Sequence, residues 1–456
     1  MSTQNRSAID VGALLDLNEW SGRQRAILAL TALAITFDGF DNQLVGFALP
    51  AIIKAWGVTR AAFGPVLAMG LVGMSVGTIF GGHVGDRLGR RVALTASIIL
   101  FGVATGLTFF ATNLTMFAVL RILAGAGIGA ALPNASALSA EFTPIRRRAM
   151  AVSLTIVCVP LGGMLAGLVA ARVLPVLGWQ TLFAIGGIAP LLFSGVLWLL
   201  LPESPRFLSR HKERWNELRA LLGKVYKEPV GDGDFVDPTE QKAETVSRVQ
   251  ALFGPAIWRD TLSLSAAYFC SLLAVYLVFN WFPSLLTSEG LGLAAASNGL
   301  AAYNFGGVVG VVLSAILIGR VGSRKPLLVI SLCGAASAIA MNFVPISSHG
   351  AQSWLLGVTA AHGFFVNALQ TSLFAVAAHV YPTKVRATGV AFSLGLGRLG
   401  AILSAFVGAA VVQAGRLAYL EAIAGALVVT FVALAILKNH IPAGLSQVRL
   451  NKVRRA

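Results

Sequence analysis

The stretch GGHVGDRLGRR, residues 81–91, separates two apolar runs at about residues 63–82 and 92–112. Its spaced glycines allow a tight turn, Asp86 can pair with a neighbouring basic side chain or face a helix N-terminus, and the arginines suit an anionic leaflet. Each flanking run has the roughly 20 residues that a helix needs to cross about 30 Å of hydrocarbon. We therefore interpret the stretch as the loop between two membrane helices. A loop that is merely positively charged is the plainer alternative.

Apolar runs of this length recur along the whole chain. Hydrophobic residues make up 56% of the 456 positions and charged residues only 12%, unlike a soluble domain. Twelve runs can be counted, at about residues 26–49, 63–82, 92–112, 115–138, 149–172, 180–201, 260–283, 296–319, 326–346, 352–379, 387–413 and 416–437. The sequence therefore predicts an all-α membrane protein with twelve transmembrane helices.

The net charge of +16 is distributed as a membrane topology requires, which argues against a nucleic-acid partner. With the N-terminus inside the cell, 29 of the 35 Lys and Arg residues fall in cytoplasmic segments and four in external ones. The other two, Arg121 and Arg398, fall inside helices. Because cytoplasmic loops of membrane proteins carry the excess of Lys and Arg, we expect both termini in the cytoplasm.

The chain divides into two similar halves around its one long polar stretch. FTPIRRRAMAVSL (142–154) aligns with PTKVRATGVAFSL (382–394), and GRVGSRK (319–325) echoes the loop at 81–91. Such an internal repeat is typical of membrane transporters. The expected parts are an amphipathic cytoplasmic segment (1–25), two pseudo-symmetric six-helix bundles (26–201 and 260–437), a central cytoplasmic loop (202–259) and a basic tail (438–456).

The sequence holds no pattern typical of an enzyme. Its three cysteines lie in apolar runs, so no external disulfide framework is expected. Gly125, Gly127 and Gly129 resemble a nucleotide-binding spacing but fall in mid-helix, where small residues let helices approach closely. We expect no metal, no cofactor and no catalytic residue.

Several of these motifs resemble those of a known transporter superfamily. GHVGDRLGRR resembles the signature loop of the major facilitator superfamily, and the layout of six runs, a long loop and six runs fits it over nearly the whole chain. PESPRFL (202–208) resembles the segment that follows helix six in its sugar and organic-anion members. DGFD, RILAGAGIGAALPNASAL, AEFTPIRRRA and GLGRLGAILS resemble the aromatic acid:proton symporters of that superfamily.

The resemblance implies import of an aromatic carboxylate such as benzoate, a hydroxybenzoate, protocatechuate or gentisate, together with protons, across a bacterial inner membrane. It also implies that charged residues needed for transport occupy Asp38, Asp41, Asp86, Arg121, Glu141, Arg386 and Arg398.

Two carboxylates lie inside the first apolar run. Asp38 and Asp41 are three residues apart and share one helix face, and an ionised group at mid-membrane costs roughly 2.5–3.5 kcal/mol unless it faces a cavity or partner. Their proximity disfavours double ionisation, which makes a proton site plausible. Arg121, about 10 Å below the outer surface by the helical rise, lies at a depth similar to that of Asp41. We expect an Asp41–Arg121 pair that opens on protonation, although a permanent ion pair would look the same.

Arg398 is the candidate for holding the substrate carboxylate. It lies about 18 Å deep, and its planar guanidinium matches a carboxylate with two hydrogen bonds. A pair with Asp38 or Asp41 is the alternative. Further substrate contacts are expected from Phe37, Phe40, Tyr303, Asn304, His362 and Gln370. The polar members could instead satisfy one another, and a phenylalanine in a membrane helix often faces lipid or core.

A third group of residues is predicted to control opening. It comprises Gly82, Asp86, Arg87, Gly89, Arg90, Glu141, Arg146 and Arg386. Charge pairs between the halves at the inner loops could lock the outward-open state and break for inward opening. Anchoring of these charges to the leaflet is the alternative.

The sequence thus predicts a monomeric importer that works by alternating access with protons, an aromatic carboxylate and the lipid bilayer as its partners. A drug or metabolite/proton antiporter is the first rival, because VPLGGMLAG (159–167) partly resembles the antiporter Gly-Pro motif. A transporter-like receptor for an aromatic acid is the second.

Overall fold

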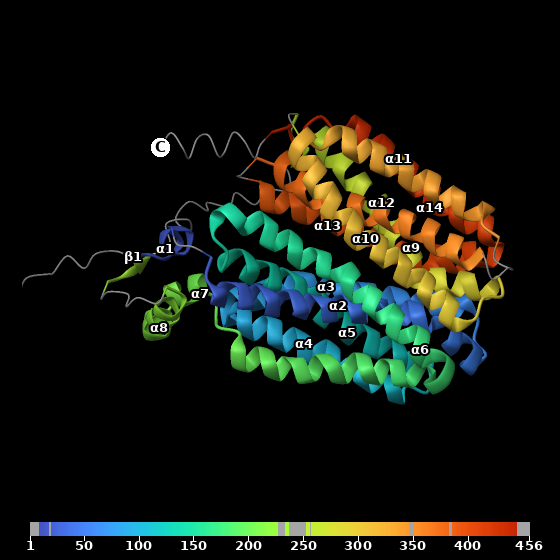
Figure 1. Ribbon diagram of the computed structural model, residues 1–456, viewed down its shortest axis with the longest axis horizontal. Helices are drawn as coiled ribbons and strands as arrows, with labels where there is room; N and C mark the ends of the chain where they lie inside the picture. Colours follow the sequence, from blue (N-terminus) through green and yellow to red (C-terminus); the bar gives the residue numbers. More distant parts are fainter. Residues whose placement is uncertain are drawn as a thin grey trace, which may run out of the picture.

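The structure, a computed structural model, describes residues 9–17, 20–226, 233–236, 252–255, 257–345, 351–382 and 385–444. Long helices dominate it (Figure 1). They are α1 (Val11–Leu17), α2 (Gly22–Trp56), α3 (Arg60–Leu88), α4 (Arg90–Leu107), α5 (Leu114–Glu141), α6 (Ile145–Leu200), α7 (Pro205–Arg210), α8 (Trp215–Tyr226), α9 (Trp258–Ser288), α10 (Leu293–Val321), α11 (Arg324–Ala340), α12 (Ala351–Val380), α13 (Arg386–Ala414) and α14 (Arg416–Ile436). The predicted all-α fold is confirmed, apart from two short strands, β1 (Ile9–Asp10) and β2 (Phe235–Val236), which pair in parallel.

Ten helices of the described chain are long and apolar enough to cross a membrane: α3 to α6 and α9 to α14. Two features account for the difference from the twelve predicted. α6 loses its helical conformation at Gly178 (φ 79°, ψ 175°), between two of the predicted runs, and the chain turns back there (Figure 1). α2 contains the first predicted run but is not among the ten, since Asp38, Asp41, Asn42 and Gln43 lower its hydropathy.

Local sequence explains where several membrane helices begin and end. Ser21 and Gln24 form a reciprocal capping box at the start of α2, and Gly57 ends that helix in the left-handed conformation (φ 63°). Thr59 and Asn113 cap α3 and α5 with their side-chain oxygens. These caps satisfy backbone groups that would otherwise lack partners at the helix ends.

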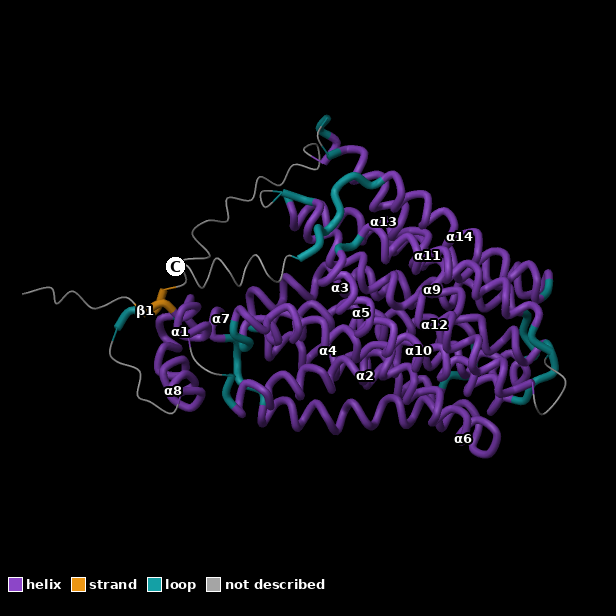
Figure 2. Tube along the Cα trace, turned by 45° about the horizontal axis from the view of Figure 1, so that its top comes forward, coloured by secondary structure: helices purple, strands orange, loops and turns teal. Residues whose placement is uncertain are grey.

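The membrane helices form two bundles that lie side by side. In the first bundle α2 to α6 pack on one another, in the second α9 to α14 do so, and the bundles meet where α2 contacts α9, α3 contacts α13 and α6 contacts α10. α1, α7, α8 and the strand pair gather at one end of the helices (Figures 1 and 2). We call this end the terminal face and the other end the opposite face.

Hydrogen bonds between the two bundles lie at mid-helix or toward the opposite face, among the membrane helices of the described chain. Gln43 of α2 and Asn304 of α10 exchange two amide hydrogen bonds, of 3.1 and 2.7 Å. Arg60 at the start of α3 donates to Ser284 near the end of α9, at 3.2 Å. Met74 of α3 contacts Tyr276 and Arg398. The bundles are therefore held together on the opposite face.

A glycine of α2, Gly46, packs directly against the backbone of α9 near that face. A Cβ on Gly46 would overlap the carbonyl oxygen of Phe279 and lie 3.4 Å from the Cα of Asn280. Overpacking of this kind costs about 1–3 kcal/mol, and about 1.4 kcal/mol already changes a population tenfold. We therefore expect Gly46→Ala to favour an arrangement in which α2 and α9 are separated, and to slow transport about tenfold or more.

Spin labels on the exposed residues Ala55 and Ser288, at the ends of α2 and α9, can measure this separation once the three native cysteines are replaced by alanine. Electron–electron distances should lengthen in Gly46→Ala. Gly292→Ala is the matched control, because a Cβ there would meet no atom within 4 Å. If the distances between the two labels are unchanged in Gly46→Ala, Gly46 is not the contact that lets α2 and α9 pack together at the opposite face.

Candidate functional site

Asp41 and Arg121 are brought together inside the first bundle. Their side chains are almost completely buried, at 0% and 5% exposure, and Arg121 Nη1 lies 3.7 Å from Asp41 Oδ1. The hydroxyl of Thr105 on α4 lies 2.8 and 2.7 Å from the two carboxylate oxygens. Arg121 Nη2 in turn donates to Thr105 Oγ1 at 3.0 Å and to Thr108 Oγ1 at 3.2 Å. Thr105 therefore links the two charges in a three-residue cluster.

Aromatic rings complete the surroundings of Arg121. Its guanidinium carbon lies 5.3 Å from the ring centre of Phe183 and 5.8 Å from that of Phe117. Ring faces attract a cation, so these contacts help to hold a buried guanidinium in place. The sequence analysis did not identify Thr105, Phe117 or Phe183, because each is an ordinary residue in an apolar run.

Asp38 lies one helical turn before Asp41 and is also buried, at 5% exposure. Its Oδ1 has no hydrogen-bond partner among the described residues. Asp41 on the same helix and Arg398 on α13 are the charged groups that act on it. Asp38 thus interacts both with Asp41 of the first bundle and with Arg398 of the second.

Arg398 is half-buried in α13 and faces the first bundle. Its Nη1 lies 2.6 Å from the sulfur of Met74 on α3, and its Nε has no hydrogen-bond partner in the described part of the chain. The hydroxyl of Tyr276 donates to the same sulfur at 3.4 Å. A thioether is a weak acceptor, so the guanidinium keeps strong donors that an anion could take up.

The predicted ring contacts are spread over different environments. Tyr303 and His362 are buried neighbours with ring centres 5.8 Å apart, and His362 Nδ1 lies 2.9 Å from Ser337 Oγ. The amide of Asn304 is hydrogen-bonded to Gln43, and Gln370 accepts a hydrogen bond of 2.8 Å from Ser271.

The two predicted phenylalanines lie in the first bundle. Phe37 packs against Phe193 of α6 with ring centres 5.2 Å apart, whereas Phe40 is half-buried beside the main core. The structure therefore brings Asp41 and Arg121 together and places Asp38 where it interacts electrostatically with Arg398, but Phe37 packs inside one bundle.

A network around Gly89 fixes the first signature loop. Gly89 adopts φ 102°, and a Cβ on it would collide with the carboxylate of Glu203. That carboxylate accepts hydrogen bonds from the backbone of Arg91 (3.0 Å) and Ser204 (2.8 Å), and the Ser204 hydroxyl donates to Glu141. Asp86 pairs with Arg90. Glu203, in PESPRFL, therefore caps α4, a role that the sequence analysis missed.

The second half repeats this arrangement with other residues. Gly322 adopts φ 82°, and Ser323 exchanges hydrogen bonds of 2.9 Å with the backbone of Ile441 after α14. Burial lowers the pKa of the neighbouring His440. Each bundle thus uses the chain that leaves its last helix to hold its signature loop.

The hydrogen bonds of the remaining loop residues, in the described part of the chain, stay within one bundle. Glu141 bonds to Ser204, and Arg386 Nε donates to the carbonyl of Tyr381 at 3.2 Å within its own bundle. Arg87 and Arg146 are exposed, and Gly82 has open space around its Cα. The expected Glu141 contact between halves stays a prediction for the other conformation.

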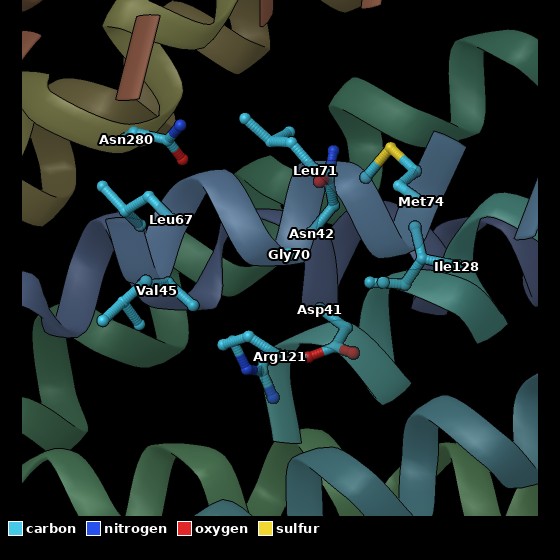
Figure 3. A pocket seen from close by; sticks show the side chains of 12 residues that line it. Asp41, Asn42, Val45, Leu67, Gly70, Leu71, Met74, Arg121, Ile128 and Asn280 are labelled. Atoms are coloured by element: carbon cyan, nitrogen blue, oxygen red, sulfur yellow. Dashed lines mark ion pairs between the residues drawn. The ribbon is translucent and has the colours of Figure 1, made fainter. Parts of the chain in front are cut away.

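A small cavity adjoins the Asp41 cluster (Figure 3). Its volume is about 40 Å³, and it is lined by Asp41, Asn42, Val45, Val66, Leu67, Gly70, Leu71, Met74, Arg121, Gly125, Ile128 and Asn280. Ligand pockets for small organic molecules measure about 300–1,000 Å³. This cavity can therefore hold water but not an aromatic acid.

Comparison with known proteins identifies the family of this chain. The chain matches the family model of the Major Facilitator Superfamily at residues 31–353 and 264–448. It is 35% identical to a gallate transporter of Pseudomonas putida over 413 residues, covering 89% of this chain and 90% of that protein. It is 34% identical to the 4-hydroxybenzoate transporter PcaK of the same species, covering 90% of each chain.

The fold also matches solved structures. A partially occluded inward-open structure of the xylose transporter XylE from E. coli superposes with a TM-score of 0.70 at 18% identity, covering 90% of this chain and 97% of that one. The family resemblance stated from the sequence motifs is confirmed: this chain belongs to the major facilitator superfamily and, within it, to the aromatic acid transporter family.

Proposed function

We propose that this protein imports a hydroxybenzoate-like aromatic carboxylate together with protons across the inner membrane of a bacterium. One observation carries the proposal: the first bundle holds two buried carboxylates, of which Asp41 pairs with Arg121 and Asp38 interacts electrostatically with Arg398 of the second bundle, whose Nε has no hydrogen-bond partner among the described residues. The gallate and 4-hydroxybenzoate transporters among its relatives support the substrate class.

The proposed roles follow from the charges. Asp38 and Asp41 take up protons, and neutralising Asp41 weakens its hold on Arg121. The substrate carboxylate binds Arg398 through two charge-assisted hydrogen bonds, next to the site that the protons have neutralised. Carrying one charge through 100 mV involves about 2.3 kcal/mol, so a monoanion must bring more than one proton if the membrane potential is to help.

The proposed orientation places the terminal face in the cytoplasm, because the sequence assigns 29 of the 35 Lys and Arg residues to cytoplasmic segments, and the described loops around Arg87 and Arg146 are two of these segments. The bundles are joined from mid-helix to the opposite face, which supports an inward-open state in this conformation. Rocking of the bundles about the central site would then expose it alternately. The loop residues Gly82, Asp86, Arg87, Gly89, Arg90, Glu141, Arg146 and Arg386 are proposed to control this motion.

Proteoliposomes with an acidic exterior test the function. We expect a labelled hydroxybenzoate to accumulate inside, and the accumulation to collapse when a protonophore removes the pH gradient. Sugars and cationic drugs, measured in the same preparation, should not accumulate. Loss of preloaded drug in response to the gradient would support an antiporter instead, and binding of the acid without flux would support a receptor. Uptake by liposomes that each contain a single copy of the protein would support a monomer.

A further inference from the structure

The small cavity beside Asp41 joins the two bundles. Eleven of its twelve lining residues come from α2, α3 and α5 of the first bundle, and the other, Asn280, comes from α9 of the second. Figure 3 shows the Asn280 amide on the far side of the cavity from Asp41 and Arg121. Near this point α2 packs tightly against α9, since a Cβ on Gly46 would lie 3.4 Å from the Asn280 Cα.

Several polar atoms around the cavity lack a partner in the described part of the chain. Asn280 is 5% exposed, and its Nδ2 has no hydrogen-bond partner; the Nε of Arg121 has none either. Buried amides and guanidinium groups are nearly always hydrogen-bonded in proteins, through ordered water where no protein group reaches them. The lining residues therefore leave hydrogen-bonding capacity that only a bound small polar molecule can satisfy.

The size of the cavity selects water as that molecule. A water needs about 10–15 Å³ of such space and two to four polar partners. The cavity has about 40 Å³, and Asp41, Asn42, Arg121 and Asn280 supply carboxylate, amide and guanidinium groups around it. Water can therefore be held between the two bundles, beside the carboxylate that is proposed to take up a proton.

We propose that this cavity holds water that connects Asn280 to Asp41, and that Asn280 is a positioning residue for proton coupling. The second part rests on the proposed proton symport. When the bundles separate at the opposite face, α9 carries Asn280 away and the water loses its partner in the second bundle. The hydration of Asp41 then differs between the two conformations, so its protonation is tied to the closure of that face.

The other charged and polar groups that face this carboxylate belong to three helices. They are Arg121 of α5, Thr105 of α4 and Asp38 of α2, with Arg398 of α13 acting on Asp38. Asn280 is the group from the second bundle in the cavity itself, so its replacement changes the link between the bundles and leaves the Asp41–Arg121–Thr105 contacts in place.

Radiolytic labelling tests the water directly, without any transport assay. Water that is held against a side chain gives rise to hydroxyl radicals on irradiation, which oxidise a nearby methionine. Met74 lines the cavity, whereas Met341 is similarly buried elsewhere, at 2% exposure against 5%. We expect Met74 to be oxidised several times faster than Met341, and this excess to disappear in Asn280→Leu. Equal rates for the two methionines in the wild type would overturn the proposal.

Transport separates a positioning role from a structural one. Asn280→Leu should lower proton-driven accumulation about tenfold and shift its dependence on external pH, while exchange of labelled for unlabelled acid changes less than twofold. Asn280→Gln should restore coupling because it keeps an amide. Leu67→Met, a volume-conserving change in the same cavity wall, is the control.

Two outcomes count against the positioning role. Exchange and accumulation that fall together in a folded Asn280→Leu protein would indicate a structural residue, and an unaltered pH profile would exclude coupling through Asn280. A wild type without any proton-driven accumulation would instead reject the proposed function, and the labelling of Met74 would still decide whether water occupies the cavity.

Discussion

Arg398→Ala is expected to weaken binding of an aromatic acid by about a hundredfold or more. A hydrogen bond to a charged group contributes about 1.5–3 kcal/mol, so the loss of a two-fold contact to the substrate carboxylate removes about 3–6 kcal/mol. Each 1.4 kcal/mol is a factor of ten in affinity. Among the described residues, this guanidinium donates its hydrogen bond to the sulfur of Met74, a weak acceptor, so its removal breaks little of the protein itself.

Calorimetric titration of the detergent-purified protein with 4-hydroxybenzoate measures this loss. Arg398→Lys should fall between the wild type and the alanine variant, because an ammonium keeps the charge but lacks the planar fork. Arg320→Ala, at an exposed position near the end of α10, is the control and should bind normally. An unchanged affinity in Arg398→Ala would show that another group holds the carboxylate.

Depth in the membrane could be predicted from the sequence because a helix rises by a fixed length per residue. On that basis alone, Asp41 and Arg121 were expected at the same level, and they lie 3.7 Å apart. Rotation about the helix axis could not be predicted in the same way. Phe37 is at a suitable depth for a ring contact, yet it turns toward Phe193 in its own bundle.

Contacts between helices were likewise beyond one sequence. Thr105 links the two charges, and Gln43 forms hydrogen bonds with the amide of Asn304. Neither partner could be predicted, because a threonine or glutamine in an apolar run does not indicate which residue it contacts. Which conformation a structure would show could not be predicted either, because one sequence must encode both conformations. The contact of Glu141 with the other half stays a prediction for another conformation, because in this one Glu141 bonds to Ser204.

Asp41→Asn is expected to abolish accumulation of the acid against its gradient while leaving exchange measurable. The amide cannot take up and release a proton, but its oxygen can still accept the Thr105 hydroxyl. The change also leaves Arg121 as a buried charge without its ion pair, and breaking a buried pair from one side costs about 3–5 kcal/mol. A lower melting temperature should therefore accompany the loss of coupling.

The double variant Asp41→Asn/Arg121→Gln separates these two effects. It removes both charges, so most of the lost stability should return, whereas proton-driven accumulation should not, because no titrating group has been restored. Three quantities are measured on the same preparations: accumulation at external pH 5.5 and 7.5, the melting temperature, and the exchange rate. If the double variant again accumulates the acid in response to the pH gradient, Asp41 is not the residue that couples the proton, and Asp38, whose Oδ1 is buried without a partner in the described chain, takes its place as the candidate.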